Sequence, residues 1–407
     1  MQGKRLRQAR LAAGFTLREF SSRLAKAGVQ LTGAALSKYE CDKSMPGAHV
    51  ILAMASELRV EPSYFFSPSS VEIEWLAFRK RASLTRGRQD QLKALATERV
   101  ERQVQLHRLL TPEQTPRFPK TDRVSQLSDA EDLAGKIRKL WRLGDGPLDS
   151  VTHSIEDHGG IVVDLETADN EFDGLSGWAD DRYPVIITSK SRSVDRKRYN
   201  LCHELGHLAM TVDGQPTEKQ RESLAHRFAG AFLVPESAVK RELGSARHHL
   251  GLAELVILKR KWGLSVQAWA RRALDLTIIS NSHYVGICKQ ISSKGWRSTE
   301  PAPLENDETP NRMKQLLARA VAEGVLHEHD AAEYPEWDSI TKQALEGKTA
   351  RKTAFDLLMS SEAERDQVLS EAAEALYDSY ATGSELRSFE AGEVLERHER
   401  APETKPH

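Results

Sequence analysis

Two histidines four residues apart, His203 and His207, enclose Glu204 in the string HELGH. On a helix, positions i and i+4 lie one turn apart on the same face, so both imidazoles can bind a single metal ion. Glu204, next to the first histidine, is then a candidate general base. This spacing indicates a zinc-type hydrolase, and its most direct interpretation is a peptidase.

A catalytic zinc normally takes three protein ligands, and the two histidines supply only two. The segment 217–232 is predicted to be a helix, because Thr217 opens a capping box with the glutamine three residues on. It offers Glu218, Glu222 and His226 on one stripe. Glu222 is the preferred third ligand, since two histidines and a glutamate form a known catalytic set. His226 is the alternative, either as a ligand or as a neighbour that stabilises the oxyanion.

The two histidines need a rigid helix, and the sequence predicts one at about 193–211, with its leucines directed to the core. Tyr199 shares the stripe of both histidines and is a second candidate for stabilising the oxyanion. Earlier helices are predicted at 127–143 and 149–158, and strands at 161–165, 177–179 and 184–188. A small sheet beside an active-site helix is the minimal scaffold of a zincin.

The segments RKRYNLCHELGHLAM and RESLAHRFAGAFLVP resemble the ImmA/IrrE family of metallopeptidases, and GLSGWADDRYPVIIT resembles the strand pair before that family's active-site helix. The resemblance covers residues 126–280. It implies that His203, His207 and Glu222 bind Zn²⁺, or Mn²⁺, and that Glu204 is the base. Glu204 would take a proton from the attacking water and return it to the leaving amine. The alternative is a metal site that has lost activity.

Two positions depart from the pattern of that family. Cys202 stands where a small alanine is usual, and His226 where an asparagine is common. Cys202 is interpreted as a small core residue, with a regulatory thiol as the alternative. The other cysteines, Cys41 and Cys288, have no pair or metal spacing, which favours a reducing compartment.

The N-terminal part of the chain has the pattern of a helix-turn-helix domain. Start and stop signals predict short helices at 3–13, 16–27, 33–40 and 48–58, with a last turn ending at 65–66. The strings GKRLRQARLAAGFTLREF, LSKYE and MPGAHVILAMASELRVEPSYFF resemble the XRE family of DNA-binding regulators. That resemblance makes 33–40 the recognition helix.

The same resemblance implies that Ser37 and Lys38 face the DNA, while Arg18 and Thr32 approach phosphates. Two departures put direct base readout in doubt: the turn AKAGVQLTG is longer than usual, and the helix begins with Gly-Ala-Ala. The alternative is a bundle kept for dimerisation or docking. Residues 1–124 carry 22 Lys and Arg against 12 Asp and Glu, which favours a nucleic-acid partner. Residues 346–407 carry 8 against 14 and form an acidic tail.

Between the two predicted domains lies a connector. Residues 71–82 and 86–110 are predicted to be helical, and the apolar stripe around Val100 and Val104 indicates either a seam between two protomers or a basic solvated helix. Three prolines mark 111–125 as a linker. The N-terminus is too polar for a signal peptide, and no stretch reaches the length of a membrane span, so a cytoplasmic protein without membrane attachment is expected.

The sequence thus predicts a mainly α chain with a small β-sheet (α+β). The predicted domains are 1–68, 69–125, 126–280 and 281–407, the last mostly helical with helices at 310–334 and 351–380 and a polar end. The predicted function is a DNA-binding regulator with a zinc-type endopeptidase that cleaves a repressor, a toxin or antitoxin partner, or itself, in a stress, mobile-element or toxin–antitoxin response. The alternative is a sensor or antitoxin whose peptidase-like domain only binds a partner. A homodimer on double-stranded DNA is expected.

Overall fold

The computed structural model describes residues 1–348, apart from 69–70, 81–84, 112–117, 120, 168–171, 191–192 and 306. The chain divides into two compact units, Met1–Glu333 and Tyr334–His407. The described part is mainly helical with a small mixed sheet, which confirms the predicted fold class. In the second unit, helix α16 spans Trp337–Lys348. The predicted helix at 351–380 and the polar end of the chain lie outside the described residues.

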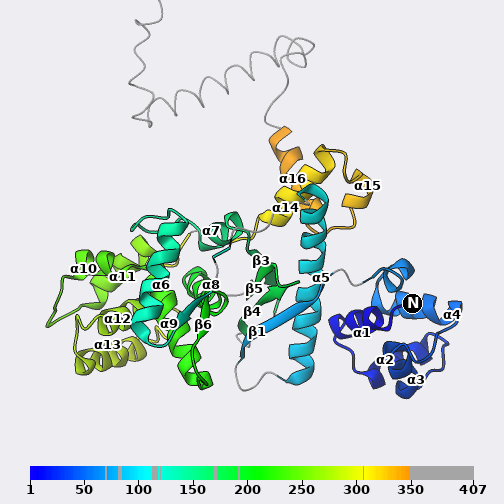
Figure 1. The fold of residues 1–407 in the computed structure, drawn as a ribbon, viewed down its shortest axis with the longest axis horizontal. Coiled ribbons are helices and arrows are strands. Elements are labelled where there is room, and N and C mark those ends of the chain that lie inside the picture. The colour runs from blue at the N-terminus through cyan, green and yellow to red at the C-terminus, as the bar shows by residue number, and fades with distance from the viewer. Residues whose placement is uncertain are drawn as a thin grey trace, which may run out of the picture. The chain divides into compact units, whose positions relative to one another are not determined.

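The N-terminal residues form five short helical elements around a core of their own (Figure 1). Helices α1 to α4 span Gly3–Ala12, Leu17–Lys26, Gly33–Glu40 and Ala48–Leu58, and the 3-10 helix η1 spans Pro62–Phe65. The Thr16 hydroxyl accepts from Glu19 N at the start of α2, and the Thr32 hydroxyl accepts from Ala35 N at the start of α3. These caps and helix positions match the predicted ones.

A four-stranded sheet lies at the centre of the first unit, in the order β1-β4-β5-β3. The strands span Ile73–Lys80 (β1), Phe172–Ala179 (β4), Tyr183–Ser189 (β5) and Ile161–Leu165 (β3). β3 and β5 run parallel, and the other pairs are antiparallel. The prediction of a helix at 71–82 is therefore wrong, because pairing of this segment with β4 overrides its helix-forming Glu, Leu and Ala residues.

The long helix α5, Arg86–Leu110, covers one face of this sheet. Its residues Val100 and Val104 are fully buried in a cluster with alternate residues of the strands, among them Val163, Val185 and Ile187. The predicted seam between two protomers is therefore wrong, since the stripe packs on the sheet of the same chain. A solvated helix is also excluded.

α5 also holds the N-terminal helices. The Arg5 guanidinium of α1 donates to both carboxylate oxygens of Glu101 on α5, at 2.5 and 2.8 Å, and both side chains are buried. Arg5 further donates to the carbonyl oxygens of Ser67 and Pro68, where the chain leaves η1. One helix thus contacts both the sheet and the N-terminal helices.

Helix α8, Val194–Ala209, lies on the opposite face of the sheet (Figure 1). Val162 and Ile186, which alternate with the residues facing α5, belong to the same core cluster as Leu201 and Leu205 of α8. Around α8 pack α6 (Leu127–Leu140), α7 (Val151–Asp157), α9 (Glu218–Leu233), α10 (Glu236–Leu243), α11 (Leu252–Trp262), α12 (Val266–Asp275) and α13 (Asn281–Ser293). α8 is therefore held between the sheet and a shell of helices.

The predicted linker at 111–125 is only partly one. Asp122–Val124 forms strand β2, which pairs in parallel with β6, Met210–Val212, directly after α8. Phe118 packs edge-on against Trp141 and Trp178. Residues 118–124, apart from 120, therefore pack on the helices and the sheet, and the sequence signal missed this because a three-residue strand has no readable period.

The predicted helix at 310–334 is two helices, α14 (Arg312–Ala322) and α15 (Glu328–Ala331), because Gly324 with φ +68° ends the first. The preceding loop is anchored by two carboxylates, of which Glu308 is buried and Glu300 is half-buried. Glu308 pairs with Arg198 at 2.6 Å, and Glu300 accepts from Lys259 Nζ and Val266 N. A separate finding concerns membrane spans: among the described helices, none is long and apolar enough to cross a membrane.

Candidate metal centre

α8 presents the two histidines as predicted. Leu201, Leu205 and Leu208 are fully buried in the core, while His203 and His207 form an edge-to-face pair with ring centroids 4.8 Å apart. α9 passes close to this edge of α8: a Cβ added to Gly206 would lie 3.0 Å from the Phe228 ring. The close approach of the two helices brings the side chains of α9 within reach of both histidines.

The three predicted ligands converge on one point. Nε2 of His203 lies 3.1 Å from Nε2 of His207, and each lies 3.3 Å from a carboxylate oxygen of Glu222. In a tetrahedral zinc site with bonds of about 2.0–2.1 Å, neighbouring ligand atoms lie about 3.3 Å apart. The three side chains, called the metal-ligand triangle below, therefore approach one another at about that spacing, with the two distances to Glu222 ending on different carboxylate oxygens, and this donor set fits Zn²⁺.

The charges of the three side chains are strongly coupled. Burial alone would lower the pKa of His207, but its hydrogen bond to Glu222 and the charges of Glu204, Glu222 and Glu218 raise it. Burial would raise the pKa of Glu222, but the hydrogen bonds and charges of both histidines hold it well below its usual range. The carboxylates thus make the centre favourable for positive charge, and a divalent cation would supply it.

Glu204 faces the sheet and is 1% exposed. Ser176 Oγ on β4 donates to Glu204 Oε2 at 2.6 Å, and the carboxylate lies against Gly174, where a Cβ would come within 2.6 Å of Oε1. Neither residue was predicted from the sequence. The available signal was a glycine just before the predicted strand 177–179, two residues before a serine, since glycines in strands often mark close approach by another group.

The two candidates for oxyanion stabilisation lie together. Tyr199 Oη is 3.1 Å from His226 Nδ1 and donates to the His226 carbonyl oxygen at 3.3 Å. The His226 ring centroid lies 4.5 Å from that of His203. Tyr199, His226 and Glu222 line the same cavity, of about 880 Å³. Both candidates are therefore adjacent to the metal-ligand triangle.

The predicted DNA-contacting residues lie on the second and third helices. Arg18, Thr32 and Lys38 are exposed, and Ser37 is half-buried. A Cβ added to Gly33 would lie 3.6 Å from Leu17, so α3 begins directly against the start of α2. The arrangement places Thr32, Ser37 and Lys38 along α3, with Arg18 on the neighbouring helix.

Residues 156–274 match the family model of the IrrE N-terminal-like domain, which belongs to the peptidases. The matched range contains strands β3 to β5, helices α8 and α9, and all of His203, Glu204, His207 and Glu222. No curated protein matches the sequence. The match supports a metallopeptidase-like domain in this part of the chain.

Proposed function

We propose that this protein is a DNA-binding transcriptional regulator that carries a metal-dependent endopeptidase. The observation that carries the enzymatic part is the convergence of His203, His207 and Glu222 next to the buried carboxylate of Glu204: the two Nε2 atoms are 3.1 Å apart, and each is 3.3 Å from one oxygen of Glu222. Zn²⁺ or Mn²⁺ bound there supplies Lewis-acid activation of water and of a peptide carbonyl.

Three side chains would carry out the other steps of peptide hydrolysis, which are proton transfer, positioning of the base and stabilisation of the oxyanion. Glu204 takes the proton of the attacking water and later returns it to the leaving amine, as a general base and then acid. The Ser176 hydroxyl, 2.6 Å from Glu204 Oε2, keeps that carboxylate in one position. Tyr199, adjacent to His226, donates to the carbonyl oxygen as negative charge develops on it.

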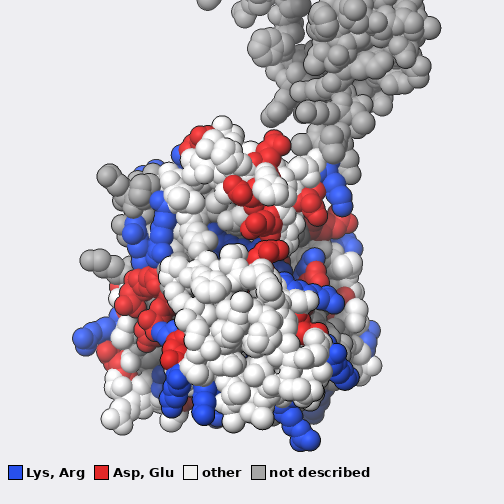
Figure 2. All heavy atoms as spheres, turned by 90° about the vertical axis from the view of Figure 1, so that its right-hand side faces the viewer, with Lys and Arg blue, Asp and Glu red and all other residues white. Residues whose placement is uncertain are grey.

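The regulatory part of the proposal rests on the N-terminal helices. Lys38 and Ser37 on α3 would contact base edges, with Arg18 and Thr32 at phosphates. Two half-sites need two such helices, so the DNA-bound form would be a homodimer. Three large apolar side chains of this module are exposed (Met45, Leu52 and Phe66), and Figure 2 shows a broad uncharged area on the face that it presents. Exposed apolar side chains on an uncharged face favour a partner protein.

For the target we propose a repressor-like protein, a toxin or antitoxin partner, or the chain itself. Such a target connects peptide cleavage to transcription in a stress, mobile-element or toxin–antitoxin response. Cleavage by a regulator that is itself bound to DNA would act locally, on proteins at the same operator.

The experiment that tests this function measures the metal content of the purified protein. We expect about one Zn or Mn per chain in the wild type, and loss of that metal in Glu222→Ala. Glu204→Gln is the matched control, because it should keep the metal and abolish cleavage of a co-expressed repressor. A wild type that takes up no metal would refute the peptidase and leave the partner-binding regulator. If the wild type binds metal but Glu204→Gln regulates transcription as the wild type does, the partner-binding regulator would also be favoured.

A further inference from the structure

Two cavities adjoin at the metal-ligand triangle. Glu222 lines the larger, of about 880 Å³, and His207 lines the smaller, of about 620 Å³. The two side chains are 3.3 Å apart. A peptide whose scissile bond lies at the triangle therefore extends into both cavities, one on each side of that bond.

Six basic and four acidic side chains line the larger cavity. Most of its charged side chains neutralise one another: Lys259 pairs with Asp195 and Glu300, and Asp275 pairs with two arginines, Arg227 and Arg271. Arg196, which also lines it, is neutralised by Asp173 behind the cavity wall, whereas Lys219 and Arg297 form no ion pair with an acidic side chain among the described residues.

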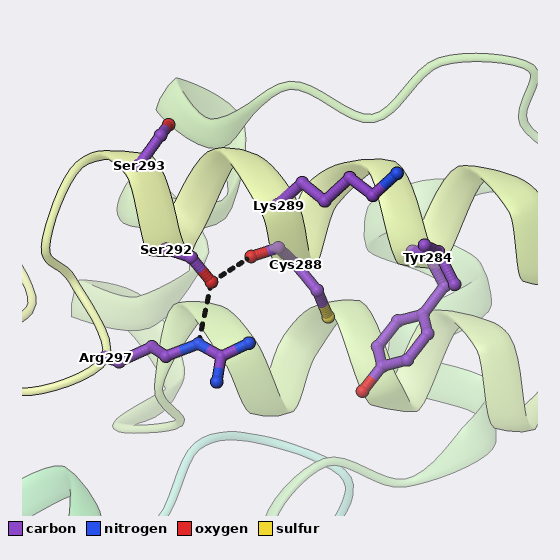
Figure 3. Close-up of a pocket in the computed structure, with 7 residues that line it drawn as sticks. Tyr284, Cys288, Lys289, Ser292, Ser293 and Arg297 are labelled. Atoms are coloured by element: carbon purple, nitrogen blue, oxygen red, sulfur yellow. Dashed lines mark hydrogen bonds between the residues drawn. The ribbon is translucent and has the colours of Figure 1, made fainter.

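Two of the basic side chains of this cavity are held in position. Arg196 is held by Asp173 of β4 at 2.9 Å. Arg297 Nε donates to Ser292 Oγ at 2.7 Å, which holds the side chain on α13 (Figure 3). The wall that carries Arg297 is itself anchored, since Glu300 accepts from Lys259 Nζ and Val266 N. A carboxylate that enters this cavity therefore meets one unpaired cation, Arg297, that is already held in place, and a second, Lys219, on an exposed side chain.

The smaller cavity has a mixed lining, in which large apolar side chains lie beside Arg221 and a few polar residues. Leu76 of the edge strand β1 lines it and is 48% exposed. Trp178 of β4 and Val212 of β6 line it as well, both half-buried, beside His207. A large apolar side chain placed here would remove exposed apolar surface from water, at about 25 cal/mol per Å².

We infer that the substrate of this peptidase is a protein segment with an acidic side chain on one side of the scissile bond and a large apolar side chain on the other. The inference rests on the proposed function. Lys219 and Arg297 act as specificity residues for the acidic side chain, and Leu76 acts as one for the apolar side chain.

Internally quenched peptides test this on the full-length, zinc-loaded protein. The set carries Glu, Ser or Lys on one side of the cut and Leu or Ser on the other, in both orders. The Glu–Leu pair in one order should be cut with the highest kcat/KM, by about tenfold over its Lys–Leu counterpart. Equal cleavage of the Glu and Lys peptides would overturn the inference.

Charge-reversal variants test which residues determine the preference for the acidic and the apolar side chain. Lys219→Glu combined with Arg297→Glu should shift the preference from Glu to Lys peptides, and Leu76→Lys should remove the preference for Leu. Lys289→Glu is the matched control, because Lys289 is an exposed lysine on α13 that lies near Arg297 (Figure 3) but outside the larger cavity. If the double variant keeps the wild-type ratio, the assignment of these residues is wrong.

A binding measurement separates failure of the inference from failure of the proposed function. Zinc-loaded Glu204→Gln should bind the fluorescent Glu–Leu peptide more tightly than the Lys–Ser peptide, measured by anisotropy. If the Glu–Leu peptide binds more tightly but the wild type cleaves neither peptide, the roles of the two cavities in binding are upheld and the peptidase is refuted. Equal affinity for both peptides would refute the inference, whatever the activity.

Discussion

Gly174 and Glu204 are in contact across the interface between β4 and α8, at a distance that leaves no room for a side chain. A Cβ on Gly174 would lie 2.6 Å from Glu204 Oε1 and 3.0 Å from its carboxylate carbon. Because Glu204 is buried, its carboxylate has little space in which to retreat. The absence of a side chain at Gly174 therefore determines where the candidate base lies.

Gly174→Ala should displace that carboxylate while leaving the metal ligands in place. We expect unchanged metal content and a loss of about 100-fold in kcat, since a misplacement of about 1 Å costs that much. Metal analysis and peptide hydrolysis measure the two quantities. Gly135→Ala on α6 is the control, because its Cβ would have no neighbour within 4 Å. Full activity in Gly174→Ala would show that Glu204 is not the base.

The buried pair of Arg5 and Glu101 predicts that helix α1 is fixed to α5. Removing one partner leaves an uncompensated buried charge, so Arg5→Met should destabilise the protein by about 3–5 kcal/mol. The double variant Arg5→Met, Glu101→Leu should recover much of that loss, because both charges are then removed. Urea unfolding measures both values, and an undiminished loss in the double variant would contradict the account.

His107 predicts a loss of stability in acid. Burial and the neighbouring Arg312 lower the pKa of this imidazole to about 4, from an ordinary 6.5. The unfolded chain therefore binds a proton at pH 5 that the folded chain does not. The stabilisation is present above pH 6.5 and is lost as pH falls towards 4, which amounts to about 2 kcal/mol between pH 7 and pH 5.

The test compares urea unfolding of the wild type and His107→Phe at the two pH values. Because all other groups titrate in both proteins, the difference between them isolates His107. The wild type should lose about 2 kcal/mol more than the variant. An equal loss in both proteins would show that His107 is protonated in the fold.

Cys202 should behave as a core residue and not as a regulatory thiol. It is fully buried, and burial raises the pKa of its thiol well above the usual range. In the native protein a maleimide should label the exposed Cys41 rapidly and Cys202 only after unfolding. Peptide mapping distinguishes the two sites. Rapid native labelling of Cys202 would restore the regulatory thiol as an interpretation.

The sequence predicted the parts of the fold that local signals specify. The caps at Thr16, Thr32 and Thr217 are short-range patterns, and the helices that they open lie where expected. The structure likewise brings His203, His207 and Glu222 together, since two share a helix turn and the third belongs to the next helix. Their roles as ligands remain predictions until metal is measured.

What the sequence could not predict depends on contacts between distant segments. β1 contains good helix formers and is a strand only because β4 pairs with it. The apolar stripe on α5 indicated that this side of the helix is buried, but its periodicity does not identify what it packs against. Ser176 and Gly174 next to Glu204, and Glu300 at the start of α12, are separated in sequence by more than twenty residues from the groups that they contact.

β1 forms an edge of the sheet and α5 covers one of its faces, and this has a consequence for self-cleavage. A cut within 111–125 would sever the N-terminal part together with both elements, which supply one edge of the sheet and the cover over Val163 and Val185. If that part then left, the peptidase would lose its edge strand and expose an apolar face to water. Self-cleavage would therefore be a one-time, irreversible event, after which the enzyme does not turn over again.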